Sequence, residues 1–292
     1  MQDVTQQSDY MLPEPADRYW AAMKTANAEL NRLVASGGTH VSTLKVRPFD
    51  PPPPMVGTAD IKIEALVPPP DAQPLSLGPL TQPRLRDRNP LFILAKAGEA
   101  VAVRVTNVQL AHYRPGTRWI VVGPDGARRA EGQLKVNENT EVRFTPDKDD
   151  MYVVVVASGN NSYRLEMLTG QRYAYEATEK QRFTVNGVFG RLYFFVPPGV
   201  GSFRFLVKAE GQAAGRGGKL TVFSPDGKAA AHLEGDLGSW TEMPVQVPAE
   251  AQGRVWCLAA EELTNNLTVY FSPENPSPYL TPDPAKVLTL RP

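Results

Sequence analysis

A chain of 292 residues is long enough for about two domains of ordinary size. Its 31 Lys and Arg residues balance its 31 Asp and Glu residues, so net charge gives no general attraction to nucleic acid or to an anionic membrane. The single cysteine, Cys257, excludes an internal disulfide, and no apolar run approaches the roughly 18 residues that a membrane-spanning helix needs. Met1–Gln7 carry neither the basic segment nor the apolar core of a signal peptide.

The N-terminal segment, residues 1–47, contains one expected helix, over about residues 16–35. Trp20, Leu30 and Leu33 recur at the spacing of one face of an amphipathic helix. One helix cannot bury its own apolar face. We therefore expect this face to pack on the β-domains, on a partner, or on an upstream domain of which residues 1–47 would be the remnant.

Residues 48–90 form a proline-rich linker that holds 12 of the 28 prolines. This density prevents a continuous helix or central strand and favours extended polyproline II structure. Within it, residues 60–67 alternate between apolar and polar side chains, as a short strand at a sheet edge does. The sequence thus predicts a stiff linker with one short strand.

A Pro-Asp-Gly triplet follows an apolar run twice, at Pro124-Asp125-Gly126 and again 101 residues later at Pro225-Asp226-Gly227. Proline presets the first turn position, aspartate tolerates the second, and glycine adopts the left-handed conformation that follows, so each triplet predicts a hairpin. The strand-like runs on either side of the two triplets also align. A long match of this kind indicates a duplicated domain.

We expect an all-β fold of two tandem β-sandwich (jelly-roll-like) domains, preceded by the helix and the linker. Repeat one covers residues 91–168, and residues 169–292 hold a connector, repeat two and an extended C-terminal tail. Several short strands at regular spacing, with glycine and proline between them, favour a sandwich over an α/β fold. Tyr152 and Trp256 occupy the same position in the two repeats, inside apolar runs, which predicts a buried role rather than sugar stacking.

Repeat one resembles the bacterial pre-peptidase C-terminal (PPC-like) family of jelly-roll β-sandwiches. The resemblance rests, in chain order, on Ala97-Gly98, the Pro124-Asp125-Gly126 hairpin, Tyr152-Val153-Val154-Val155 and Tyr163-Arg164-Leu165. It implies an extracytoplasmic, non-catalytic appendage that is periplasmic, secreted or on the cell surface.

Repeat two is similar to the galactose-binding-like sandwiches that end large secreted bacterial hydrolases. This likeness rests on Tyr193-Phe194-Phe195-Val196-Pro197 and Val255-Trp256-Cys257-Leu258. Both resemblances describe a fold more closely than a function.

The residues offer little for catalysis. His40, His112 and His232 are far apart in sequence and show no metal-ligand spacing, and no nucleophile elbow or phosphate loop is present. We therefore expect no enzyme and no cofactor, but a binding or accessory region of an exported bacterial protein, which binds carbohydrate or docks to a neighbouring catalytic domain. A structural spacer or cell-surface interaction module is the alternative, and a hydrolase is the third.

Asp147, Asp149 and Asp150 form the densest acidic group. Calcium sites need several converging oxygen ligands, which such a loop could supply. A solvated turn is the alternative interpretation. The basic groups at residues 84–88 and 128–129 lack interleaved aromatic residues, so we interpret them as solvated surface and expect no nucleic-acid partner.

Trp240 is the candidate ligand-binding residue, with Asp236 as its polar neighbour. It lies in a glycine-containing connection where repeat two gains residues relative to repeat one. An exposed Trp beside a carboxylate is typical of a sugar-binding element. The alternative is that Trp240 folds down over the open end of the sandwich.

Overall fold

The computed structural model describes residues 21, 23–29, 31–32, 35, 56, 61–70, 74–75, 77–113, 115–210, 218–261, 266–272 and 277–291. The chain divides into two compact units, Met1–Phe49 and Asp50–Pro292. In the first unit, the described positions between residues 21 and 35 are helical. Trp20, Leu30 and Leu33, which carry the expected apolar face, lie outside the described residues. No helix among the described residues is long and apolar enough to cross a membrane.

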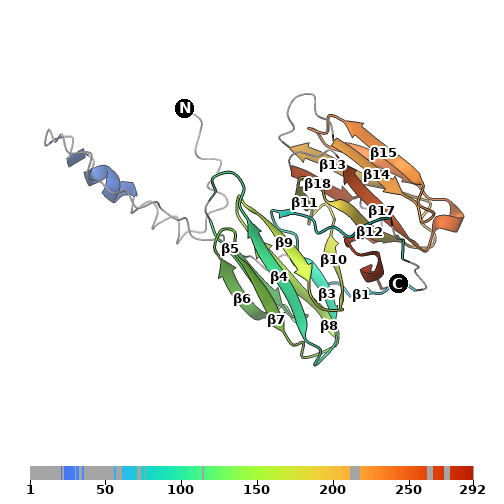
Figure 1. Ribbon diagram of the computed structural model, residues 1–292, viewed down its shortest axis with the longest axis horizontal. Helices are drawn as coiled ribbons and strands as arrows, with labels where there is room; N and C mark the ends of the chain where they lie inside the picture. Colours follow the sequence, from blue (N-terminus) through green and yellow to red (C-terminus); the bar gives the residue numbers. More distant parts are fainter. Residues whose placement is uncertain are drawn as a thin grey trace. The chain divides into compact units, whose positions relative to one another are not determined.

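The second unit consists of antiparallel β-sheets (Figure 1). The six-stranded sheet has the order β19 (Tyr279–Leu280), β10 (Arg172–Glu176), β3 (Leu91–Ala95), β8 (Asp150–Ala157), β5 (Thr117–Val122), β6 (Arg128–Leu134). The eight-stranded sheet has the order β16 (Thr241–Gln246), β13 (Ser202–Glu210), β18 (Asn266–Phe271), β11 (Phe183–Asn186), β2 (Leu85–Arg86), β9 (Ser162–Met167), β4 (Val101–Val108), β7 (Asn139–Phe144). The four-stranded sheet has the order β12 (Gly190–Val196), β17 (Arg254–Glu261), β14 (Gly218–Phe223), β15 (Ala229–Gly235). Strands β1 (Leu66–Val67) and β20 (Thr289–Leu290) pair with each other, and short 3₁₀ turns lie at Ala249–Ala251 and Pro284–Lys286. The expected all-β class is confirmed.

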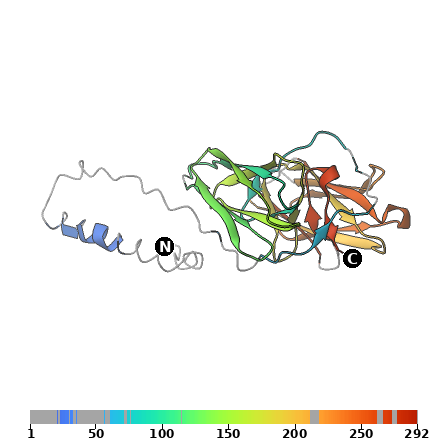
Figure 2. The ribbon, with the colours of Figure 1, turned by 90° about the horizontal axis from the view of Figure 1, so that it is seen from below.

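The strand order repeats within this unit. Figure 2 shows its sheets from a second direction, turned by 90° from the view of Figure 1. Strands β3-β8-β5-β6 have the same order and chain sequence as β12-β17-β14-β15, and β9-β4-β7 correspond to β18-β13-β16. The two sets meet at the centre of the eight-stranded sheet, where Leu85 of β2 pairs with Val185 of β11. Both residues belong to one hydrophobic core that includes strands from all three large sheets. The unit therefore has a continuous core across this central seam.

Both Pro-Asp-Gly triplets lie in hairpins, as predicted: one joins β5 to β6 and the other joins β14 to β15. The amide of Gly126 donates to the carbonyl of Gly123 (2.9 Å), and the amide of Gly227 donates to that of Ser224 (2.9 Å). Gly126 and Gly227 have φ angles of 76° and 81°, in the region that glycine adopts without steric cost. Each hairpin also has a register shift just before the turn.

Tyr152 and Trp256 are buried in the core, with exposed fractions of 1% and 0%, which confirms the prediction. The indole N–H of Trp256 donates to the carbonyl of Ala251 (3.0 Å), and its ring packs edge-to-face on Phe203 (5.7 Å). The Tyr152 hydroxyl donates to the carboxylate of Asp147. Each polar group of these large aromatic side chains thus has a partner, as burial requires.

The proline-rich segment and the C-terminal tail cover the outer faces of two sheets. Leu66 and Leu288 pack on the outer side of the six-stranded sheet, while Leu77 and Val287 pack on the outer side of the four-stranded sheet. The short strand expected within residues 60–67 is limited to β1, which pairs with β20 rather than with an edge of a large sheet. The proline-rich segment and the C-terminal tail therefore bury apolar side chains on the outer faces of both sheets.

Candidate functional site

The outer face of the eight-stranded sheet is largely polar. Because side chains alternate across a strand, the residues between the core positions of β13, β18, β11, β2, β9 and β4 point away from the core. Residues on this face include Arg84, Arg86, Arg104, Arg164, Glu166, Thr184, Arg204, Leu206, Thr268 and Tyr270. This sheet is the natural place to look for a binding surface.

Ion pairs lie toward the two lateral parts of this face. Arg104 on β4 bonds Glu166 on β9 (2.8 Å) and Glu141 on β7 (3.2 Å). In the other half of the sheet, Arg204 on β13 bonds Glu242 on β16 (3.3 Å). These side chains are between a third and three-fifths exposed, so each pair contributes little stability in water.

Trp240, which immediately precedes β16, lies on this face with 39% of its surface exposed. Its ring packs edge-on against Tyr270 of β18, with centroids 5.2 Å apart. The guanidinium carbon of Arg182 lies 5.0 Å from the centre of the Trp240 ring and 5.6 Å from that of Tyr270. Attraction between the cation and the ring electrons holds the three side chains together.

The residue that enters the core from this loop is Leu237, not Trp240. Leu237 is buried, and its carbonyl accepts a hydrogen bond from the amide of Ala209 (2.8 Å). Asp236 is exposed, and its carboxylate accepts the amide of Gly238 (2.9 Å). Asp236 therefore shapes the turn that leads to Trp240.

The three acidic residues considered for calcium each have a different local partner. The Asp147 carboxylate accepts a hydrogen bond from the Tyr152 hydroxyl and forms an ion pair with Arg129 (3.3 Å). The hydrogen bond from Tyr152 lowers the pKa of the Asp147 carboxyl. The Asp149 carboxylate accepts a hydrogen bond from the amide of Ala97 (2.8 Å), and the Asp150 carboxylate accepts one from the amide of Met151. Within the part of the chain that the structure describes, no group of three or more His, Cys, Asp or Glu side chains converges on one point.

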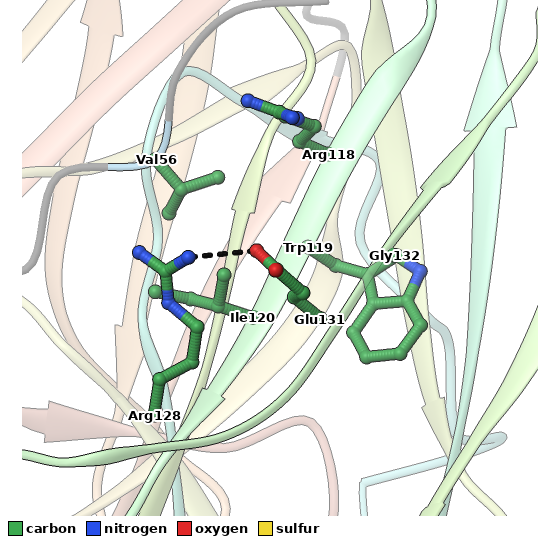
Figure 3. Close-up of a pocket in the computed structure, with 7 residues that line it drawn as sticks. All are labelled: Val56, Arg118, Trp119, Ile120, Arg128, Glu131 and Gly132. Atoms are coloured by element: carbon green, nitrogen blue, oxygen red, sulfur yellow. Dashed lines mark hydrogen bonds and ion pairs between the residues drawn. The ribbon is translucent and has the colours of Figure 1, made fainter.

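A shallow pocket lies on β5 and β6 near Val56 (Figure 3). Arg128 and Glu131 form an ion pair (2.7 Å) beside Ile120, and Arg118 lies at one end. Behind them, the Trp119 ring covers Gly132, where a β-carbon would come within 2.4 Å of the ring. Of the basic group at residues 128–129 noted in the sequence, only Arg128 lines this pocket.

A hydroxyl–imidazole–carboxylate chain crosses β14 and β15. Thr221 Oγ1 lies 3.2 Å from His232 Nδ1, and His232 Nε2 lies 3.0 Å from Glu234 Oε2. The side chains of His232 and Glu234 are 44% and 63% exposed. The sequence alone does not reveal this hydrogen-bonded group, because Thr221 comes from the neighbouring strand. The His-x-Glu spacing does place His232 and Glu234 on the same face of β15.

Comparison with known proteins gives no relative: no family model, no curated protein and no solved structure matches this chain. The candidate site therefore depends on geometry alone. Its best-formed element is the cluster of Trp240, Tyr270 and Arg182 on the outer face of the eight-stranded sheet.

Proposed function

We propose that this chain is a non-catalytic binding region and that it binds carbohydrate through the outer face of the eight-stranded sheet. The observation that carries the proposal is the partly exposed Trp240 ring, held by Tyr270 and Arg182. Sugar rings have apolar C–H faces that pack on aromatic rings, and hydroxyls that accept hydrogen bonds from guanidinium groups. The cluster supplies both kinds of contact.

In this proposal the second unit consists of two tandem β-sandwich (jelly-roll-like) domains that arose by duplication. Support comes from the matching strand orders and the two equivalent hairpins. The region would serve an exported bacterial protein outside the cytoplasm, where polysaccharides are abundant, and would hold a neighbouring catalytic domain close to its substrate. The amphipathic N-terminal helix is the segment that we expect to dock on that domain.

Binding of the full chain to a panel of soluble polysaccharides tests the proposal. Trp240→Ala should weaken binding about tenfold, which corresponds to about 1.4 kcal/mol, while leaving thermal stability nearly unchanged. Tyr113→Ala is the matched control, because Tyr113 is also an exposed aromatic residue (45%) but lies on another loop. Absence of binding by the unmodified chain would favour the spacer interpretation, and equal binding by the two variants would remove Trp240 from the site.

A hydrolase is the second candidate function, favoured by the Thr221–His232–Glu234 chain. In such an activity His232 would take the proton from the Thr221 hydroxyl, and Glu234 would stabilise the imidazolium. Turnover of activated esters that disappears in both Thr221→Val and His232→Gln would support it. Turnover that persists in either variant would exclude these residues as its source.

A further inference from the structure

Four arginines on or beside the central strands of the eight-stranded sheet have no Asp or Glu partner among the residues that the structure describes. Arg84 and Arg86 flank Leu85 of β2, Arg164 belongs to β9, and Arg182 directly precedes β11. Since Leu85 and its partner Tyr163 lie in the core, the side chains on either side of them point to the outer face. In this register Arg84 lies opposite Arg164.

The hydrogen bonds of these arginines go to neutral groups. Arg84 donates to the carbonyl of Asn186 (3.2 Å), Arg86 to that of Asn160 (2.6 Å), and Arg182 to that of Glu179 (3.2 Å). Arg164 is exposed. Among the described residues, no Asp or Glu side chain lies within ion-pair distance of any of the four.

The lateral strands of the same face differ. There Arg104 and Arg204 have carboxylate partners, and Arg143 on β7 pairs with Glu141. The positive charge is thus compensated at both sides of the face and left uncompensated along its centre. The register of β2 and β9 places Arg84 opposite Arg164, and burial, with a smaller contribution from Arg164, lowers the pKa of the Arg84 guanidinium.

We propose that this central band binds an anionic polysaccharide, one that carries carboxylate or sulfate groups. The inference rests on the proposed carbohydrate-binding function and adds the charge of the ligand. Guanidinium groups bind carboxylate and sulfate oxygens with two parallel hydrogen bonds. The Trp240 cluster would contact a sugar ring at one end of the band, and Arg84 and Arg164 would bind acidic groups farther along it.

The dimensions of the band favour a linear polymer. Arg182 lies at one end of β11 and Asn186, the partner of Arg84, lies at the other. Four residues of strand span about 13 Å, which exceeds the length of a single sugar unit. Proteins that bind single-stranded nucleic acid place aromatic side chains along the whole groove, whereas here the aromatic pair lies at one end only. The arrangement therefore fits an acidic polysaccharide better than nucleic acid.

The experiment measures the affinity of the full chain for polygalacturonate, dextran sulfate, neutral dextran and a thymidine oligonucleotide, at low and at physiological salt. We expect at least one acidic polysaccharide to bind about tenfold or more tightly than dextran, with a difference that shrinks as salt screens the charges. Preference for polygalacturonate identifies carboxylate as the bound group, and preference for dextran sulfate identifies sulfate.

Two variants that each remove one positive charge test whether the central band itself binds the polymer. Arg164→Gln removes an uncompensated charge, whereas Arg143→Gln removes one already paired with Glu141. Only Arg164→Gln should weaken binding of the acidic polymer, by about fivefold or more, and binding to dextran should not change.

Equal losses in the two variants would overturn the proposal, because they would indicate general electrostatic attraction. Tighter binding to the oligonucleotide than to either acidic polysaccharide would also overturn it. Equal binding to dextran and the acidic polymers would refute the charge preference but leave the carbohydrate-binding function standing. Absence of binding to every polysaccharide would refute both.

Discussion

The sharpest test of the fold is replacement of Trp256 by alanine. Trp256 is fully buried on β17, packs edge-to-face on Phe203 and donates a hydrogen bond to Ala251. Removal of a large core aromatic residue costs about 3–5 kcal/mol, because burial is lost and a cavity remains. The buried Ala251 carbonyl also loses its indole donor, which adds to the cost. We therefore expect a loss in the upper half of that range.

Urea denaturation followed by circular dichroism measures this loss. The matched control is Trp240→Ala, which removes the same side chain from a partly exposed site and should cost less than about 1 kcal/mol. Trp256→Phe should fall between the two, because it keeps a ring in the core but loses the hydrogen bond to Ala251. The dependence of the unfolding free energy on urea concentration should stay the same if only stability changes.

Two results would refute the reasoning. One is a cost for Trp256→Ala no larger than that for Trp240→Ala. The other is a two-step unfolding curve in which Trp256→Ala shifts only one step, because the core continues across the Leu85–Val185 seam and should unfold as one unit.

Three further predictions concern the seam, the pH dependence and the thiol. The Asn89 side chain accepts a hydrogen bond from the backbone amide of Thr184 (2.8 Å) and donates one to the backbone carbonyl of Thr184 (3.0 Å). Asn89→Ala leaves both backbone groups unpaired and should lower the free energy of unfolding, measured in urea, by about 2–4 kcal/mol. A loss below about 1 kcal/mol would contradict this. Burial raises the pKa of Glu176, so the folded state binds its proton more tightly than the unfolded state, and the resulting stabilisation, present below the unfolded pKa, is lost as pH rises through the folded pKa. Glu176→Gln should therefore gain stability relative to the unmodified chain as pH rises above the ordinary glutamate pKa of 4.5, and a pH-independent difference would argue against it. Burial also raises the pKa of the Cys257 thiol to about 12, so an aromatic disulfide reagent at pH 8 should react only as fast as the chain unfolds; rapid reaction without urea would show that the thiol is accessible.

Local signals in the sequence determined much of the fold. Several short strand-like runs at regular spacing, with glycine and proline between them, predicted the all-β class. Turn chemistry predicted both Pro-Asp-Gly hairpins, and the shared position of Tyr152 and Trp256 predicted that both are buried. Each of these inferences depends on residues close together in the chain or on comparison of the two repeats.

The contacts of the candidate site were decided by tertiary structure. Leu85 and Arg86 lie in a proline-rich segment that reads as a linker, yet they form the strand that joins the two halves of the eight-stranded sheet. Trp240, Tyr270 and Arg182 come from three separate segments. Their contact depends on strand order and register, which are set by packing across the core and not by local spacing. The sequence shows the number of arginines, but it does not show their neighbours. Which strands lie side by side in the sheet decides that Arg104 has carboxylate partners and that Arg164 has none among the described residues.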